Sequence, residues 1–383
     1  MGQSHLYNRR AFIRLAGGIA VAAGLPPRAR ANDDALTDIA GRTLRLRLPA
    51  SRIVLGDGPL AYVVALLRPG NPFSTVVGWG DNFRAADLAG YEAFRTRFPM
   101  IERIPTFRGS EVGALDAEQA IGLEPDVMVL NLSSRAAAES SGLLAHLADA
   151  GIPTVFVDFR TQMFANAEAS VRIMGRLLGA EARAEEFLRF RAEQIARVLD
   201  PLRRIDGRPR VMLERAAGLY DDCCLSYGDG NFGQLLAQAG GENLGTRLLH
   251  GAFGTLHPEQ VIAADPDVVL VTGADWSLYS PSGDWVRLGP GANPEDSRAR
   301  LACLMQRPAY RNLGAVANGR VYAIWHAFYD NPCCFVALQQ IAKWLHPQLF
   351  TSLQAEQTFR ELHARFLPIP YQPGYWVSLE ETA

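Results

Sequence analysis

Lysine is almost absent from this sequence, in which Lys343 is the only one, and neither sign of charge is in clear excess. The 38 basic and 40 acidic residues leave a net charge of -2, which excludes the strongly basic surface typical of nucleic-acid-binding proteins. Past the N-terminal region, no apolar run approaches the length of a membrane-spanning helix. With 48% hydrophobic and 20% charged residues in a chain of 383, the composition predicts a globular protein and excludes disordered, collagen-like and coiled-coil chains.

Cysteine is scarce as well, because five cysteines in 383 residues are too few for a disulfide scaffold. Four of them nevertheless form two adjacent pairs, Cys223-Cys224 and Cys333-Cys334, while Cys303 stands alone. The pairs are therefore candidates for a disulfide or a metal site rather than for a scaffold.

The first 31 residues have the features of an export signal. The arginines Arg9 and Arg10 are followed by an apolar run from Leu15 to Leu25, and then by the cleavage-site pattern of residues 29–31. Paired arginines before such a run resemble a twin-arginine signal, which exports folded proteins. Residues 1–31 hold five arginines and no acid, so their removal takes the net charge from -2 to -7. We therefore predict an acidic, soluble periplasmic protein.

An internal repeat with an offset of 141 residues is the strongest feature of the chain. Each copy predicts a short helix, a Pro-Asp turn and an aliphatic strand that is buried on both faces. A duplicated unit of this kind predicts two lobes of similar α/β build. The residues Leu115, Glu118, Gln119, Ile121, Pro125, Asp126 and Val127 recur in register as Leu256, Glu259, Gln260, Ile262, Pro266, Asp267 and Val268.

Apolar residues at helical spacing fill the segment 163–200 between the two copies. Gly175 and Gly179 weaken this pattern without ending it, so the sequence predicts one long helix of roughly 50 Å that joins the lobes. Strand-like and helical segments alternate on both sides, which indicates a parallel sheet in each lobe. The predicted units are an N-terminal lobe (51–160), the linking helix (163–200), a C-terminal lobe (207–350) and a C-terminal tail (351–383).

In their order and spacing, these segments resemble the periplasmic substrate-binding proteins of ABC importers for ferric siderophores, haem and cobalamin. The resemblance covers residues 51–350 and rests on the two repeats together with the segments 230–243, 307–322 and 341–347. It implies an α/β fold of two Rossmann-like lobes with parallel sheets bridged by one long helix, a shallow cleft between them and limited hinge motion.

The resemblance also implies a function, which is to capture a metal chelate and deliver it to the membrane permease. It implies a monomer without enzymatic activity, whose partners are an ABC permease, its ATPase and a small-molecule iron chelate rather than nucleic acid. No cofactor is required for this role. The sequence does not choose among a ferric siderophore, haem and a cobalamin-type complex.

The loops that follow each strand are expected to line the cleft, because ligands of open α/β sheets bind outside the carboxyl ends of the strands. These loops mix aromatic rings with arginines, as an anionic chelate with an aromatic shell requires. For any single ring, burial in the core is the alternative. The ligand-binding candidates are Asp57, Trp79, Phe83, Arg84, Arg108, Arg135, Tyr220, Tyr227, Trp276, Tyr279, Trp325, His326 and Tyr329.

Glu118 and Glu259 occupy matching positions of the repeat. In the family that the chain resembles, one surface glutamate on each lobe docks onto arginines of the permease, and these two residues are the candidates for that role. Charge pairing of this kind sets the orientation and the rate of association. The alternative is that each glutamate only stabilises the first turn of a helix.

The cysteine pairs depart from the pattern of that family, and both fall in loops expected on the cleft side of the C-terminal lobe. In an oxidising periplasm the default is disulfide bonding, such as one pair to the other. The alternative is a metal or metal-cluster site of four thiolates from Cys223, Cys224, Cys333 and Cys334, which would make the chain a cofactor-bearing periplasmic protein instead. Adjacent residues of an extended chain point to opposite sides, which makes them awkward ligands of one metal ion.

Overall fold

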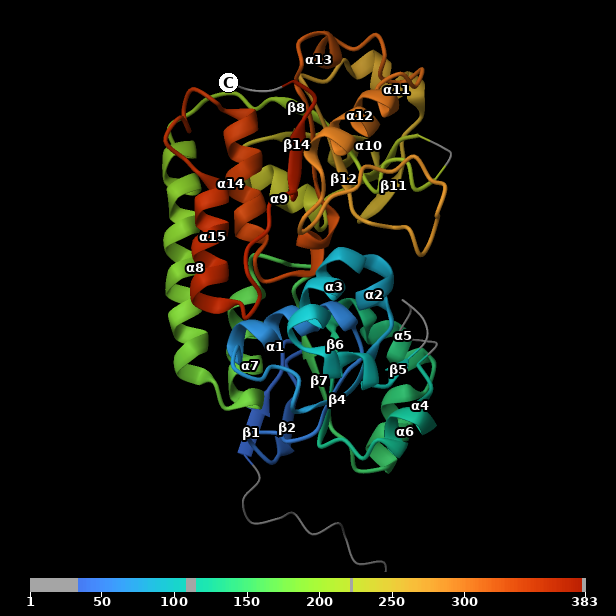
Figure 1. Cartoon of the computed structure of the whole chain (residues 1–383), viewed down its shortest axis with the longest axis vertical. Helices are drawn as coiled ribbons and strands as arrows, with labels where there is room; N and C mark the ends of the chain where they lie inside the picture. The colour runs from blue at the N-terminus through green and yellow to red at the C-terminus, as the bar shows by residue number, and fades with distance from the viewer. Residues whose placement is uncertain (1–33, 108–114, 221–222, 381–383) are drawn as a thin grey trace, which may run out of the picture.

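The computed structural model describes residues 34–107, 115–220 and 223–380, which form two α/β lobes, one above the other in Figure 1. The expected export signal, residues 1–31, lies outside the described residues. Within those residues, no helix has the length and apolar character needed to cross a membrane. The predicted fold class, α/β with two lobes, is confirmed.

The first lobe is built on five parallel strands in the order β5-β4-β3-β6-β7. Val129 of β6 faces one hydrophobic cluster and Met128 faces another, as expected for a sheet covered on both faces. A hairpin of β1 (Asp34–Thr37) and β2 (Thr43–Leu46) precedes this sheet. Its strands are β3 (Ile53–Leu55), β4 (Val76–Gly80), β5 (Thr106–Phe107), β6 (Val127–Asn131) and β7 (Thr154–Val157), and its helices are α1 (Ala61–Leu67), α2 (Asn82–Ala86), α3 (Leu88–Arg97), α4 (Ala117–Gly122), α5 (Arg135–Ser140) and α6 (Leu143–Asp149).

The second lobe has a mixed sheet in the order β11-β9-β8-β12-β13-β14, with β10 paired to β8. The predicted parallel arrangement holds for its centre, β8-β12-β13, whereas β9, β11 and β14 are antiparallel. Its strands are β8 (Arg210–Glu214), β9 (Leu225–Tyr227), β10 (Glu242–Asn243), β11 (Phe253–Thr255), β12 (Val268–Gly273), β13 (Val321–Trp325) and β14 (Trp376–Ser378), and its helices are α9 (Phe232–Gln238), α10 (Leu244–Leu248), α11 (Pro258–Ala264), α12 (Pro294–Leu304), α13 (Gly314–Ala317), α14 (Cys334–Leu345) and α15 (Ala355–Phe366).

The link between the lobes consists of two helices, which corrects the predicted single helix over 163–200. Helix α7 (Ala167–Leu178) ends at Gly179, whose φ is +63°, and α8 (Glu181–Leu202) begins two residues later. The N–H of Ala180 bonds back to the carbonyl of Gly175 at 2.7 Å, so Gly179 supplies the left-handed residue that closes a helix. Helix α8 then runs alongside both lobes and packs on α14 (Figure 1).

Residues 351–380 are part of the fold rather than a tail, which corrects the predicted boundary at residue 350. Helix α15 packs against α14 of the second lobe and contacts α1 of the first. Strand β14 extends the second sheet by pairing with β13 in antiparallel register. This segment therefore completes one sheet and also touches the opposite lobe.

The two copies of the repeat have the same local structure at their Pro-Asp turns. In the first copy, the backbone N–H of Arg52 donates to Asp126 at 2.9 Å, and the Arg52 guanidinium donates to carbonyl oxygens just past the end of α4. In the second copy, the N–H of Arg210 donates to Asp267 at 2.7 Å, and its guanidinium reaches carbonyl oxygens at the end of α11. Each turn is thus hydrogen-bonded to an arginine at the start of a central strand of its own lobe. Arg52 directly precedes β3, and Arg210 is the first residue of β8.

Candidate binding pocket

A pocket of about 740 Å³ lies between the two lobes. Its lining comes from segments that follow β4, β6 and β7 in the first lobe and β8, β12 and β13 in the second, with further residues from the β9 and β11 region. The predicted position of the cleft, outside the carboxyl ends of the strands, is therefore the position of the pocket. Its volume is in the usual range for sites that hold small organic ligands.

The charged side chains that line the pocket are both arginines, Arg160 from the first lobe and Arg215 from the second. No aspartate or glutamate appears among the described lining residues. The rest of the lining is rich in rings, with Tyr220, Tyr227, Phe253, Trp276, Tyr279, His326 and Tyr329. This combination favours an anionic ligand with an apolar or aromatic body.

Arg160 interacts with two buried carboxylates. Its guanidinium forms an ion pair with the buried Asp330, and its Nη2 lies 3.6 Å from Oδ1 of the buried Asp57. The same nitrogen donates to the hydroxyl of Tyr329 at 3.3 Å, and the guanidinium carbon lies 5.0 Å from the centre of that ring. Arg160 belongs to the first lobe and Asp330 to the second, so this ion pair joins the lobes at the base of the pocket.

Arg215 differs because no carboxylate lies within ion-pairing distance of it among the residues that the structure describes. It follows β8 directly, and its backbone N–H donates to the carbonyl of Leu225 at 2.7 Å. Its guanidinium carbon lies 5.8 Å from the ring centre of Tyr227 and 5.1 Å from that of Phe253. The two rings orient the side chain without neutralising its charge.

His326 and Tyr227 bring buried polar groups to the pocket wall. The Nδ1 of His326 lies 2.9 Å from the hydroxyl of Thr272. Burial, together with the charges of Arg215 and Arg160, lowers the pKa of His326 to about 3, so its imidazole is neutral at physiological pH. The hydroxyl of Tyr227 is buried, and burial raises its pKa above the ordinary value although the nearby Arg215 opposes the shift.

Six of the ligand-binding candidates line the pocket together: Tyr220, Tyr227, Trp276, Tyr279, His326 and Tyr329. Tyr220 and Tyr279 remain more than half exposed at 55% and 53%, whereas Trp276 is buried. Their contact with a ligand remains a prediction. Asp57 lies beneath the pocket, where it faces Arg160 instead of lining the wall.

Trp79, Phe83 and Trp325 are buried in the core and do not line the pocket, which corrects their predicted role. The Trp79 ring packs edge-on against Phe83 at 5.7 Å, and the Trp325 ring packs against Tyr375 at 5.1 Å. Trp79 and Trp325 lie within strands, so their side chains point into the layers that cover the sheets. For these rings the alternative reading, a buried core position, is the right one.

Two predicted arginines are not among the described lining residues of the pocket. Arg84 is exposed, with its guanidinium 5.7 Å from the ring centre of Tyr91, and Arg135 pairs with Glu139 at 2.7 Å on helix α5. Arg108 lies outside the described residues. The arginines that do reach the pocket, Arg160 and Arg215, were not predicted. The sequence holds a signal for both, because each follows the end of a buried strand within three residues.

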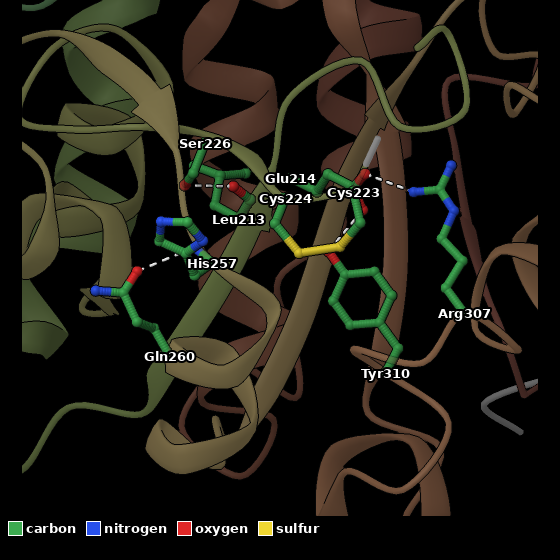
Figure 2. Close-up of a disulfide and its surroundings, with 9 residues drawn as sticks. All are labelled: Leu213, Glu214, Cys223, Cys224, Ser226, His257, Gln260, Arg307 and Tyr310. Carbon is green, nitrogen blue, oxygen red and sulfur yellow. Dashed lines mark hydrogen bonds and ion pairs between the residues drawn. A yellow bond between two sulfur atoms is a disulfide. The ribbon is translucent and has the colours of Figure 1, made fainter. Parts of the chain in front are cut away.

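The cysteines do not come together as a four-thiolate site. Cys223 and Cys224 are joined to each other by a disulfide, shown in Figure 2, which corrects the expected bond between the two pairs. Two sulfurs of the proposed cluster are therefore not free thiolates. Cys333 and Cys334 are buried free thiols at the start of α14, and burial raises the pKa of both. Among the described residues, no group of three or more His, Cys, Asp or Glu is placed to hold a metal ion.

The disulfide lies beside a buried polar cluster (Figure 2). Glu214, the last residue of β8, accepts hydrogen bonds from Tyr310 at 2.6 Å and Arg307 at 2.7 Å. The Cys224 sulfur lies 3.8 Å from the same Tyr310 hydroxyl. This cluster therefore joins the two ends of the loop from β8 to β9, since Glu214 directly precedes Arg215 at one end and Cys224 directly precedes β9 at the other.

Glu118 and Glu259 are both exposed in the first turns of equivalent helices, α4 and α11. Each helix leads through its Pro-Asp turn into a buried parallel strand, β6 or β12. The two lobes therefore present one glutamate each in the same local setting.

A family model of the periplasmic binding proteins matches residues 107–326, which is more than half of the chain. The chain therefore belongs to this family, and the resemblance to the class that serves iron chelates, haem and cobalamin is confirmed. Proteins of this family are substrate-binding components of ABC transporters rather than enzymes, and they work with a permease and an ATPase. No curated protein matches the sequence.

Among solved structures, the TroA-like periplasmic binding protein FepB from Veillonella parvula is similar with a TM-score of 0.82 and 26% sequence identity, over 90% of this chain and 99% of that one. The periplasmic haem-binding protein RhuT from Roseiflexus sp. RS-1 aligns with a TM-score of 0.56 and 24% identity, over 78% of this chain and 99% of RhuT. The molybdate-binding protein MolA from Haemophilus influenzae aligns with a TM-score of 0.68 and 16% identity, over 89% and 100% of the two chains. The last two likenesses concern the fold alone.

Proposed function

We propose that this protein captures an anionic metal chelate with an organic shell in the pocket between its lobes and delivers it to an ABC permease. A ferric siderophore is the first candidate, and a haem- or cobalamin-type complex is the second. The observation that carries the proposal is the lining of the pocket, which combines two arginines and several aromatic rings with no carboxylate among its described residues.

Arg215 and the rings around it support an organic anion rather than a bare inorganic one. A small oxyanion needs a few donors in a tight site, whereas this pocket has about 740 Å³ and exposed rings at Tyr220, Phe253 and Tyr279. Rings at the mouth bury the apolar part of a ligand while the arginine pairs with its oxygens. MolA has a similar fold and binds molybdate, so molybdate is the natural comparison ligand.

Fluorescence titration tests the proposal, because Trp276 lies in the pocket wall. A ferric tris-catecholate, a ferric hydroxamate, haemin and cobalamin are each added to the purified protein, with molybdate as the inorganic comparison. We expect saturable quenching by one of the organic complexes and none by molybdate, and the Trp276→Phe variant should lose most of the quenching. Binding of molybdate alone, or of no complex, would refute the assignment.

Delivery to the permease is assigned to Glu118 and Glu259, one on each lobe. Because a single chain presents both acids in equivalent settings, one monomer has the two contacts that a two-subunit permease requires. Their exposure leaves both carboxylates accessible to a partner protein, which supports this role.

A further inference from the structure

Two buried carboxylates from different lobes face each other beneath the pocket. Asp57 follows β3 in the first lobe, Asp330 follows β13 in the second, and each is only 1% exposed. The side-chain nitrogen of Asn131 donates to Asp57 at 3.0 Å and to Asp330 at 3.1 Å. The two carboxylates therefore share one hydrogen-bond donor, the amide nitrogen of Asn131.

Among the described residues, the one cation that pairs with these acids is Arg160 at the base of the pocket. The other described hydrogen-bond partners of this group are neutral at pH 7. Asn82 donates to Asp57 at 2.8 Å, and the phenol of Tyr329, whose pKa burial raises to about 12, lies against the Arg160 guanidinium. Arg215 lies farther away, on the second lobe. The buried group thus contains two acids and one guanidinium.

We propose that Asp57 and Asp330 take up a proton when an anionic ligand binds against Arg160, so that ligand capture is coupled to protonation of this pair. This inference rests on the proposed function and adds to it the number of protons that the protein takes up when the ligand binds. In the empty protein, the guanidinium stabilises both carboxylates. A ligand anion adds a third negative charge around the same guanidinium, beside two carboxylates that are buried, and like charges so close raise the proton affinity of one acid.

Asp57 and Asp330 are positioning residues in this scheme, because they act on the ligand through Arg160. The proton comes from the solvent and leaves with the ligand, so one cycle of capture and release is balanced. Burial, with a further contribution from Asp57, already raises the pKa of Asp330 to about 6 against the opposing charge of Arg160. Asp330 is therefore mostly ionised at pH 7 in the empty protein, but its pKa is close enough to 7 for it to accept a proton on binding.

Calorimetry measures the proton count directly. The ferric complex of a tris-catecholate chelator is titrated into the full-length protein at pH 7 in phosphate, HEPES and Tris, whose ionisation enthalpies differ. The slope of binding enthalpy against ionisation enthalpy gives the protons taken up. Protonation changes of the chelate itself are the same for every variant, so differences between variants report the protein.

On binding the chelate, the wild type should take up as much as one proton more than the Asp330→Asn variant. If Asp330→Asn fails to fold, Asp57→Asn is the second variant. The matched control is Asp87→Asn, which removes another buried acid with a raised pKa that neither lines the pocket nor pairs with Arg160, and it should leave the count unchanged. Equal slopes for the wild type and both pocket variants would overturn the proposal.

Infrared spectroscopy of the ligand-free protein separates this proposal from the proposed function. A protonated carboxyl stretch that appears below about pH 6 and disappears in Asp330→Asn supports the shared acid pair even where no tested chelate binds. The absence of that band at pH 5 would overturn the pair, whatever the binding experiments show.

Discussion

The guanidinium carbon of Arg215 lies 5.1 Å from the ring centre of Phe253 at the mouth of the pocket. This contact orients the arginine while no described carboxylate neutralises it. Arg160 is the opposite case, because its charge is shared with Asp57 and Asp330. The two arginines of the pocket therefore differ in setting, and we expect a ligand anion to pair with Arg215 as well as with Arg160.

Replacing Arg215 with glutamine should weaken binding of an anionic ferric chelate by roughly 10- to 100-fold, the usual worth of a charge-assisted hydrogen bond. The melting temperature should stay near that of the wild type, since the side chain forms no described ion pair. Arg135→Gln, which breaks an exposed pair outside the pocket, is the control and should bind normally. Unchanged affinity in Arg215→Gln would remove this residue from the ligand site.

Charge reversal at Glu118 and Glu259 should abolish transport without changing ligand affinity. The double variant Glu118→Lys/Glu259→Lys is compared with Glu295→Lys, which alters an exposed glutamate in the first turn of α12 and so shares the same helix-end setting. We expect uptake by reconstituted transporter to fall at least tenfold only in the double variant. Equal uptake by all three proteins would assign the two glutamates to helix stabilisation alone.

Asp87 should make the protein less stable as the pH rises from about 4 to 6. Burial raises its pKa from 3.8 to about 6, although hydrogen bonds from Tyr62 and Gly90 oppose the shift. The folded protein then binds this proton more tightly than the unfolded chain does, so the favourable contribution is full at low pH and disappears above pH 6.

Urea unfolding of the wild type and of Asp87→Asn at several pH values measures this effect. From pH 6.5 to pH 4, the wild type should gain about 1–3 kcal/mol relative to the variant. Parallel curves for the two proteins would show that Asp87 has an ordinary pKa.

The cysteine pairs should differ in chemical state. Alkylation of the denatured protein without reductant is expected to label Cys303, Cys333 and Cys334, and to leave the peptide with Cys223 and Cys224 unlabelled. Alkylation of the native protein should label only Cys303, because the other two thiols are buried. A peptide pair that joins residue 223 or 224 to residue 333 or 334 would contradict the disulfide seen here.

The sequence predicted correctly the parts of the fold that depend on a local residue pattern, and this pattern occurs in both copies of the repeat. The Pro-Asp turns before β6 and β12 could be read from the repeat, because a proline, an aspartate and an aliphatic run define a turn and a buried strand together. The break at Gly179 was missed because a glycine inside a helical pattern is usually tolerated, and only the left-handed conformation seen here turns it into a helix end.

The sequence predicted the location of the candidate site more accurately than the residues that line it. Trp276 and Trp325 both stand near strand ends, yet Trp276 lies three residues beyond β12 and reaches the pocket, whereas Trp325 is still within β13 and points into the core. A shift of one or two residues at a strand end decides between these outcomes, and sequence patterns do not fix strand ends so closely. The pairing of Arg160 with Asp330 joins opposite lobes, which no local pattern encodes.

Helix α8 and the buried bonds of Asn131 and Arg160 to Asp330 tie the two lobes together. A protein held in this way has its binding geometry before the ligand arrives, so we expect capture to proceed at the rate of encounter and unassisted escape to be slow. If the protein has the proposed function, we expect spontaneous opening to contribute little to unloading, so that separating the lobes and emptying the pocket falls to the transporter.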